Sequence, residues 1–226
     1  MIDKKNKINL SPRLKLCAEF VPESCNFLDI GTDHAYLPIS LLQEGKIKKA
    51  LACDINAEPL NLAKANATKH CVALDTRLSN GFETIDENEF DCATIAGMGG
   101  DLIGAILKNC TYIKSKTLIL QPMSKAYKLR EFLFANGFYI EKEQAIMDKG
   151  KIYSVMLVKQ GKSNNTCVYM GQIKPQSNFS KEYALSVISN LKNMLKSAEN
   201  SELQNKINEI ERGFLDEKHW YIQFNW

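Results

Sequence analysis

The chain has 226 residues, of which 45% are hydrophobic, and its formal net charge is only +3. This length suits one ordinary domain with an appendage, and so small a charge does not by itself identify a nucleic-acid-binding protein. No stretch approaches the roughly 18 apolar residues of a membrane span, and the charged residues 1–7 lack the apolar region of a secretory signal, so we expect a cytoplasmic protein without a membrane partner.

Helices and strands alternate in the first part of the chain. Ser11 and Pro12 are typical of a helix start, and Pro22 ends that helical pattern. Short apolar runs then predict strands, and segments of helical periodicity follow them. The predicted strands are residues 26–30, 50–55, 71–74, 90–96 and 117–121, and the predicted helices are 34–43, 58–69, 100–107 and 125–136.

Two further strands, residues 138–145 and 152–159, follow each other without a helix between them. A turn that contains Gly150 joins them, which predicts an antiparallel hairpin at the end of the sheet. Strand–helix alternation elsewhere requires parallel strands joined by right-handed crossovers. The predicted fold class is therefore α/β: a doubly wound, mostly parallel, seven-stranded Rossmann-like sheet with an antiparallel last strand.

The composition changes after residue 160. Residues 161–180 are rich in Gly, Ser, Asn and Gln, which indicates a connector. Apolar residues then recur at helical spacing at Tyr183, Val187, Leu191, Met194 and Ala198, and after a polar break at Leu203, Ile207 and Ile210. This pattern predicts two helices, which either form an antiparallel hairpin or pack on the main domain. We expect a domain of residues 1–160 and a helical tail of residues 161–226.

The segment FLDIGTDHAYLP, residues 27–38, joins the first sheet strand to the next helix. Gly31 lets the backbone approach a ligand closely. Classical dinucleotide sites hold a pyrophosphate here, but the carboxylates of Asp29 and Asp33 would repel one. They suit a cationic ligand such as S-adenosylmethionine, which carries an ammonium and a sulfonium group. In the alternative interpretation, Asp33 only caps a helix and His34 is a surface residue.

Three other strand ends carry candidate ligand contacts. Asp54 lies 23 residues after Gly31 (54 − 31), where an acid commonly binds ribose hydroxyls. Asn80 and Gly81 follow the third strand, in a loop that either contacts an adenine ring or is an ordinary polar loop. The glycines of residues 94–100 leave the backbone open beside a ligand, or serve tight strand–helix packing.

Other catalytic templates are missing. The sequence has no GxSxG, P-loop or HExxH motif, and its three histidines are far apart. The seven cysteines are dispersed without a CxxC pair, which favours reduced, buried thiols and no metal site. The Asn-Pro-Pro-aromatic motif of many amino-methylating enzymes is also absent.

Five segments in this order, LDIGTDHAYLPI, ALACDI, LSNGF, TIAGMGG and LILQPM, resemble the bacterial tRNA (adenine-22, N1)-methyltransferase family. That family has a class I methyltransferase domain and a C-terminal coiled-coil hairpin. The resemblance covers about residues 11–160 by motif and the tail by architecture alone. It implies transfer of a methyl group from S-adenosylmethionine to N1 of an adenine in the D-loop region of tRNA, with the tail assisting tRNA recognition.

The resemblance also implies a set of cofactor-binding residues, namely Asp29, Gly31, Thr32, Asp33, His34, Asp54, Ile55, Asn80, Gly81, Ala96, Gly97, Met98 and Gly99. Adenine N1 attacks with its own lone pair, so the protein must align the reactants rather than remove a proton. The product ring is cationic, and a carboxylate would stabilise its charge. We therefore expect Asp33 to be catalytic, with His34 as a second candidate for base stacking or proton transfer.

The target adenine must be unpaired or flipped out of its helix. Tyr36 and Phe82 are candidate stacking platforms, and Lys125 and Arg130 are candidate phosphate contacts. Gln121 and Pro122, at the end of a strand, are further substrate-binding candidates. We expect a monomer that binds tRNA. Two alternatives stay open: a methyltransferase of another substrate, and a catalytically silent RNA-binding module of the same fold.

Overall fold

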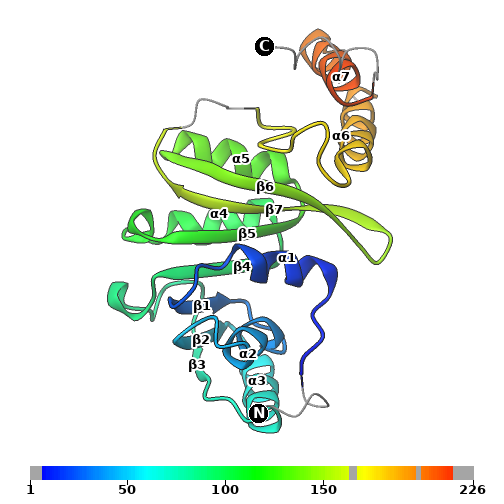
Figure 1. The fold of residues 1–226 in the computed structure, drawn as a ribbon. Helices are drawn as coiled ribbons and strands as arrows, with labels where there is room; N and C mark the ends of the chain where they lie inside the picture. Colours follow the sequence, from blue (N-terminus) through cyan, green and yellow to red (C-terminus); the bar gives the residue numbers. More distant parts are fainter. Residues whose placement is uncertain (1–6, 163–166, 197–199, 216–226) are drawn as a thin grey trace.

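The computed structural model describes residues 7–162, 167–196 and 200–215. One seven-stranded sheet crosses the molecule in the order β3-β2-β1-β4-β5-β7-β6 (Figure 1). Its strands are β1 (Asn26–Ile30), β2 (Lys49–Asp54), β3 (Asp75–Leu78), β4 (Cys92–Gly99), β5 (Thr117–Ser124), β6 (Phe138–Asp148) and β7 (Lys151–Gln160). Strands β1 to β5 are parallel, and β7 runs antiparallel to both β5 and β6. The predicted fold class is confirmed.

Helices cover both faces of this sheet. They are α1 (Pro12–Phe20), α2 (Tyr36–Gln43), α3 (Ala57–Lys69), α4 (Gly100–Lys108) and α5 (Ala126–Ala135), with short 3₁₀ turns η2 (Glu87–Glu89) and η3 (Ile113–Ser115). In β1, Leu28 packs in the core beneath α4 and α5, whereas Phe27 packs in the core beneath α1 and α2. Because successive strand residues point to opposite faces, an uninterrupted apolar run is what a doubly covered strand requires.

Two predicted boundaries are wrong. Residues 71–74 are not a strand: Cys71 has a left-handed backbone (φ 55°) that ends α3, and β3 begins only at Asp75. The strand itself, DTRL, lies at the sheet edge without a fully buried residue, so it has no apolar run to reveal it. Helix α2 begins at Tyr36 rather than at residue 34, because Ala35 is also left-handed (φ 55°).

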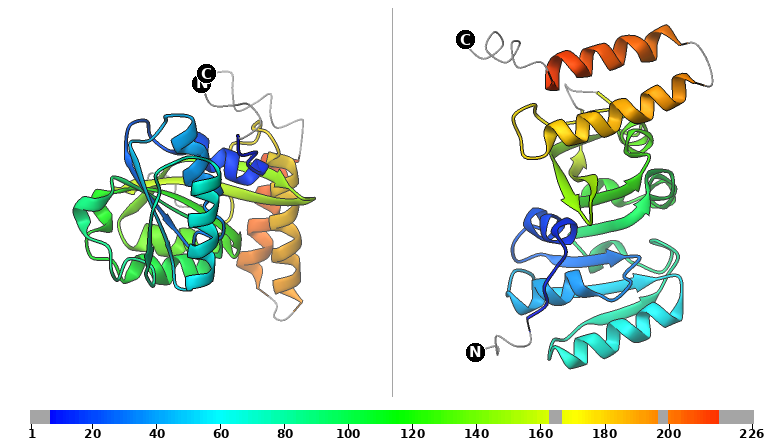
Figure 2. Two further views of the ribbon diagram at one scale, coloured as in Figure 1. Left: turned by 90° about the horizontal axis from the view of Figure 1, so that it is seen from below. Right: turned by 90° about the vertical axis from the view of Figure 1, so that its right-hand side faces the viewer.

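The tail consists of α6 (Ser180–Leu195) and α7 (Ser201–Phe214), which lie side by side at the β6 end of the sheet (Figure 2). Leu191 and Ile207 are buried between them, as the apolar stripe predicted, while Ala198 lies outside the described residues. Ala145 of β6 belongs to the same cluster, so the tail packs on the sheet domain. The division into two domains stays a prediction.

A buried ion pair joins the tail to the sheet domain. The Arg130 guanidinium on α5 donates to Glu143 Oε1 on β6 at 2.6 Å and to the Tyr183 hydroxyl on α6 at 2.7 Å. It also donates to the carbonyls of Val168 and Tyr169 in the connector. Burial alone would lower the pKa of Arg130, but the charge of Glu143 holds it above its ordinary value. Arg130 therefore stays charged and fixes α6 against α5 and β6.

None of the helices in the part of the chain that the structure describes is long and apolar enough to cross a membrane.

Candidate active site

The carboxyl ends of β2, β1, β4 and β5 lie next to one another along one edge of the sheet. The chain passes from β1 to β2 on one side and later enters β4 on the other side of β1. In open α/β sheets, ligands bind in the crevice outside this reversal of strand order. Asp29, Asp54 and residues 96–99 come from these strand ends, so the fold brings the predicted cofactor residues to one edge.

Asp29 is the buried carboxylate of this edge, with 8% of the residue exposed. Thr32 Oγ1 donates a hydrogen bond of 2.6 Å to its Oδ2. Burial raises the pKa of Asp29 to about 6, the hydrogen bond from Thr32 lowers it, and the nearby charge of Asp54 raises it. Among the described residues, no Lys or Arg lowers the pKa of this carboxyl group. A cationic ligand would lower it and favour the charged form, and the ammonium group of S-adenosylmethionine is such a cation.

Gly31 is the close-approach position. Its φ of 74° lies in the left-handed region that favours glycine, and a Cβ built on it would lie 2.0 Å from the terminal methyl carbon of Met98. The backbone amides of Gly31 and Thr32 both donate to the Cys53 carbonyl of β2, which pins the turn against the neighbouring strand. At the end of β1, therefore, the Gly31 backbone has no side chain of its own and is covered by the flexible side chain of Met98.

Asp54 ends β2 beside this turn. Its Oδ1 accepts a hydrogen bond of 2.8 Å from the backbone amide of Asn56, which orients the carboxylate at the start of α3. The next residue, Ile55, is 62% exposed, an unusual position for a large apolar side chain. A carboxylate next to an exposed apolar side chain fits a ribose with its hydroxyls and the flat ring attached to it.

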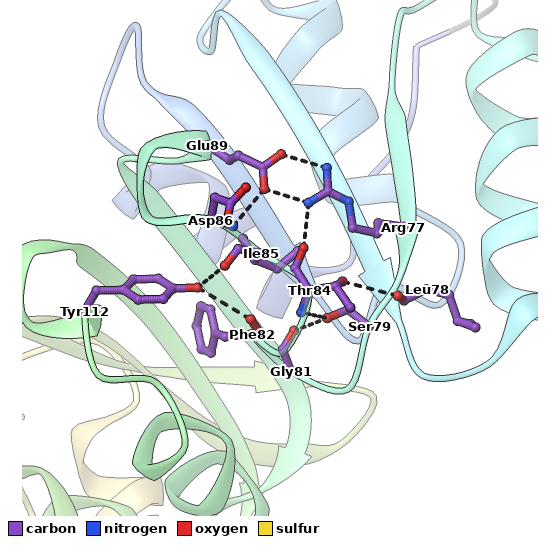
Figure 3. A network of polar contacts seen from close by, with 10 residues as sticks. All are labelled: Arg77, Leu78, Ser79, Gly81, Phe82, Thr84, Ile85, Asp86, Glu89 and Tyr112. Carbon is purple, nitrogen blue, oxygen red and sulfur yellow. Dashed lines mark hydrogen bonds and ion pairs between the residues drawn. The ribbon is translucent and has the colours of Figure 1, made fainter.

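The loop after β3, residues 79–89, is held by a polar network (Figure 3). Ser79 Oγ donates to the Gly81 carbonyl, and Arg77 forms a bidentate pair with Glu89 at 2.6 and 2.7 Å. The hydrogen bonds from Arg77 lower the pKa of Glu89 to about 2. The Asn80 amide lies outside this network and donates to exposed Glu83. The loop is thus preorganised, with Asn80 presented at its surface.

Phe82, which we expected to be a stacking platform, is 6% exposed and packs against Phe90 and Tyr112 in the core. That expectation is wrong, because the ring faces away from solvent.

The carboxyl end of β4 is held in place by hydrogen bonds that connect it to Arg13 of α1 through Gln121. Gly97 (φ 83°) donates its backbone amide to Gln121 Oε1 at 3.1 Å, and the Arg13 guanidinium donates to the same oxygen at 2.7 Å. Arg13 Nε also lies 3.7 Å from the buried carboxylate of Asp148. Arg13 thereby connects the hairpin of β6 and β7 to the glycine segment of the active edge. Sequence reasoning missed this role, since Arg13 and Gln121 are 108 residues apart.

Asp33 and His34 lie in the turn before α2. The Asp33 side chain is 80% exposed, and its Oδ2 lies 3.4 Å from His34 Nε2. The His34 ring stacks on Tyr36 with ring centroids 5.2 Å apart, and Tyr36 is 41% exposed. The N-cap of α2 is Ala35, and no side chain caps that helix, so Asp33 is not a capping residue. The three side chains form an accessible aromatic and acidic group at the active edge.

Two predicted substrate contacts are wrong. Arg130 is fully buried, and its guanidinium is engaged by Glu143 and Tyr183, so it is not available to pair with an RNA phosphate. Gln121 is also fully buried, and its amide oxygen is engaged by Gly97 and Arg13. Both side chains have the donors or acceptors that RNA contacts require, but the fold uses them internally.

Pro122 and Lys125 line a groove between the end of β5 and α6; Pro122 is itself buried, whereas Lys125 is exposed. Lys125 forms an ion pair with Asp101 at its surface position.

Among the described residues, no group of three or more His, Cys, Asp or Glu side chains is arranged to hold a metal ion. The absence of a metal requirement stays a prediction.

Five of the cysteines are buried, whereas Cys71 is exposed; the buried ones are Cys17, Cys25, Cys53, Cys92 and Cys110.

Residues 10–156 match the family described as "Methyltransferase domain". Among curated proteins, the tRNA (adenine(22)-N(1))-methyltransferase of Bacillus subtilis is 36% identical over 160 residues, which are 69% of this chain and 67% of that protein. Among solved structures, Streptococcus pneumoniae Sp1610 in complex with S-adenosyl-L-methionine is 32% identical, with a TM-score of 0.80, and the match covers 95% of this chain and 100% of that one.

The M. capricolum protein TrmK, solved with S-adenosyl-homocysteine, is 33% identical with a TM-score of 0.77, and the match covers 90% of this chain and 96% of that one. Both structural matches cover 90% or more of this chain, so they include part of the tail as well as the sheet domain. The chain therefore belongs to the bacterial tRNA (adenine(22)-N(1))-methyltransferase family.

Proposed function

We propose that this protein transfers a methyl group from S-adenosylmethionine to N1 of an adenine in tRNA, at position 22 as the name of its Bacillus subtilis relative states. The observation that carries the proposal is the buried Asp29 carboxylate beside the bare backbone of Gly31. This edge offers a site for a cationic ligand and no phosphate cradle. When bound, S-adenosylmethionine supplies an electrophilic methyl group that adenine N1 attacks with its lone pair, which leaves the positive charge on the methylated ring.

Different residues of the active edge would bind different parts of S-adenosylmethionine. Asp29 would receive its ammonium group, Asp54 its ribose hydroxyls, and Ile55 and Asn80 its adenine. The glycine segment 96–99, held by Gln121, would leave room for the reacting groups. Their shared contribution is alignment, which is the main requirement for a nucleophile that needs no deprotonation.

Asp33 and His34 would act on the target base. An exposed carboxylate at the active edge stabilises the charge that develops on the adenine ring, and the paired rings of His34 and Tyr36 offer a surface on which a flipped base stacks. We expect Asp33→Asn and His34→Ala to keep the affinity for S-adenosylmethionine and to lower turnover. Full turnover in both variants would remove these side chains from the mechanism.

The decisive experiment is methyl incorporation from labelled S-adenosylmethionine into an unmodified tRNA transcript, followed by mapping of the modified base. A transcript with guanine in place of adenine 22 is the matched control and should accept no label. Label in another nucleotide or in a protein would assign another substrate. Binding of tRNA without any heat of S-adenosylmethionine binding would instead indicate a silent RNA-binding module.

Three further proposals follow from a tRNA substrate. The protein would act in the cytoplasm, where tRNA is modified, and α6 and α7 would assist tRNA recognition. It would act as a monomer, and light scattering on the protein with and without tRNA checks that expectation.

A further inference from the structure

A groove of about 640 Å³ lies between the carboxyl end of β5 and helix α6. Residues 122–127 form one wall, α6 forms the other, and residues 152–154 of β7 line it between them. None of the predicted cofactor residues lines this groove. It adjoins the active edge through Ser124, which pairs with Gly99 of β4. The groove is therefore a separate binding space that begins where the active edge ends.

Ser154 is the polar residue in this lining that lacks an internal role. It is 1% exposed, and its Oγ has no hydrogen-bond partner in the part of the chain that the structure describes. Buried hydroxyl groups in folded proteins are almost always hydrogen-bonded. An unpartnered buried hydroxyl in the lining of a groove points to a ligand that completes its hydrogen bond.

The rest of the lining defines the chemistry of that ligand. Tyr127 and Tyr169 stack on each other at 5.8 Å between ring centroids, and Asn190 and Asn193 present amides from α6. No Asp or Glu lines the groove, whereas Lys125 does. Aromatic faces and neutral amides fit a planar heterocycle, and Lys125, whose ion-pair partner Asp101 lies outside the lining, suits a phosphate attached to it.

The walls of the groove are fixed in place. Tyr183 on α6 accepts a hydrogen bond from Arg130 on α5, and both residues also line the groove. Because Arg130 is held by Glu143 in the core, α6 cannot separate from the sheet domain without exposing a buried charge. The tail therefore contributes a preformed wall rather than a loose flap.

We propose that this groove binds one unpaired nucleotide of the tRNA, next to the target adenine in the same strand, with its base against Tyr127 and its hydrogen-bonding edge toward Ser154 and Asn190. This inference rests on the proposed function, because it takes tRNA as the substrate. It gives the tail a direct contact with a base beside the reacting one.

Three variants test it: Tyr127→Leu, Asn190→Ala and Ser154→Ala. Ser189→Ala is the control, since Ser189 lies next to Asn190 on α6, is exposed and does not line the groove. Each groove variant is titrated with unmodified tRNA and with transcripts that have an abasic site on the 5′ or the 3′ side of the target adenine. S-adenosylmethionine affinity and urea unfolding are measured in parallel.

Tyr127→Leu should weaken binding of intact tRNA by about 10-fold, the effect of losing one base-stacking contact. One of the two abasic transcripts should weaken wild-type binding by a similar factor, and Tyr127→Leu should bind that transcript no more weakly than wild type does. Ser154→Ala should weaken tRNA binding without lowering stability, because its hydroxyl has no internal partner to lose. Ser189→Ala should behave as wild type.

Equal tRNA affinity of Asn190→Ala, Tyr127→Leu and wild type would overturn the proposal, and so would additive losses with both abasic transcripts. These are binding measurements, so they stay interpretable if no methyl transfer is found. Wild-type methylation of adenine 22 with no effect of the groove variants would sink this inference alone, whereas absence of methylation would sink the proposed function.

Discussion

The terminal methyl group of Met98 covers Gly31, at a place where a Cβ on residue 31 would lie 2.0 Å away from it. Two segments 67 positions apart (98 − 31) thus meet over the end of β1. Because a thioether side chain is flexible, Met98 can yield to a ligand, whereas the backbone of Gly31 cannot change its conformation as cheaply.

Gly31→Ala should therefore abolish S-adenosylmethionine binding and destabilise the fold by about 1–2 kcal/mol, the cost of a left-handed alanine. Gly45→Ala is the matched control, since Gly45 also has a positive φ (66°) but no atom lies within 4 Å of the place that a Cβ would take there. Calorimetric titration and urea unfolding should show similar stability losses in both variants but a binding defect only at residue 31. Retained binding in Gly31→Ala would show that the ligand does not approach this turn.

S-adenosylmethionine affinity should depend on pH through Asp29. The pKa of Asp29 in the empty protein is raised to about 6, so the carboxyl group is neutral below that pH and charged above it. A cationic ligand binds the charged form, so affinity should fall about 10-fold between pH 7 and pH 5. Asp29→Asn should bind weakly at both pH values. Titration calorimetry across this window checks the sign, and equal slopes in the two proteins would locate the titrating group elsewhere.

The stability of the empty protein should depend on the ionisation of Asp29 in the opposite direction: it should rise, rather than fall, as the pH is lowered. A raised native pKa means that the folded state favours the protonated carboxyl, so the charged form costs stability above pH 6. Relative to Asp29→Asn, the wild type should gain stability as the pH falls from 6 toward 4. Urea unfolding of both proteins without ligand measures this difference, and a wild type that instead loses stability relative to the variant would contradict it.

Arg13 should act as a positioning residue. Arg13→Ala removes one of the two hydrogen bonds to Gln121 Oε1 and frees that side chain to leave Gly97. We expect kcat to fall about 10-fold, the value of one charge-assisted hydrogen bond. Lys15→Ala is the control, because Lys15 is an exposed cation on the same helix. If Arg13 contacts RNA phosphates instead, the loss will appear in tRNA affinity and its salt dependence, with kcat unchanged.

Breaking the buried pair of Arg130 and Glu143 should be the most damaging of these changes. Arg130→Ala leaves an unpaired buried carboxylate and should lower the free energy of unfolding by about 3–5 kcal/mol. The double replacement Arg130→Met and Glu143→Leu should recover much of that loss, since it removes both charges. Lys128→Ala, which breaks the exposed pair with Glu131 on the same helix, should change stability little. Urea unfolding compares the four proteins.

Much of the fold follows from local patterns in the sequence. The runs NFLDI and TLILQ are mainly apolar because β1 and β5 are covered on both faces, and this identifies them as central strands. The edge strand β3 escaped detection because its residues, DTRL, face solvent in part. Ala35 and Cys71 shifted element ends because alanine and cysteine give no signal for a left-handed backbone.

The candidate site divides in the same way. Residues at a strand end that we expect to contact the ligand, such as Asp29 and Asp54, are visible in the sequence because they interrupt apolar runs. Gln121 and Arg130 show why residue type alone misleads. Each has polar atoms suited to RNA, but Gln121 hydrogen-bonds to Arg13 of α1 and Arg130 pairs with Glu143 of β6. Ser154 has no sequence signal at all, since only the structure shows that its hydroxyl is buried and unpartnered among the described residues.

The contacts that join Asp148, Arg13 and Gln121 also have a consequence for synthesis on the ribosome. Helix α1 is made before β6, so Arg13, which holds Gln121 beside the glycine segment of β4, lacks its buried partner Asp148 until then. Nascent chains arrested before residue 148 should accordingly fail to retain the methyl donor, even though every residue expected to touch it has already been made.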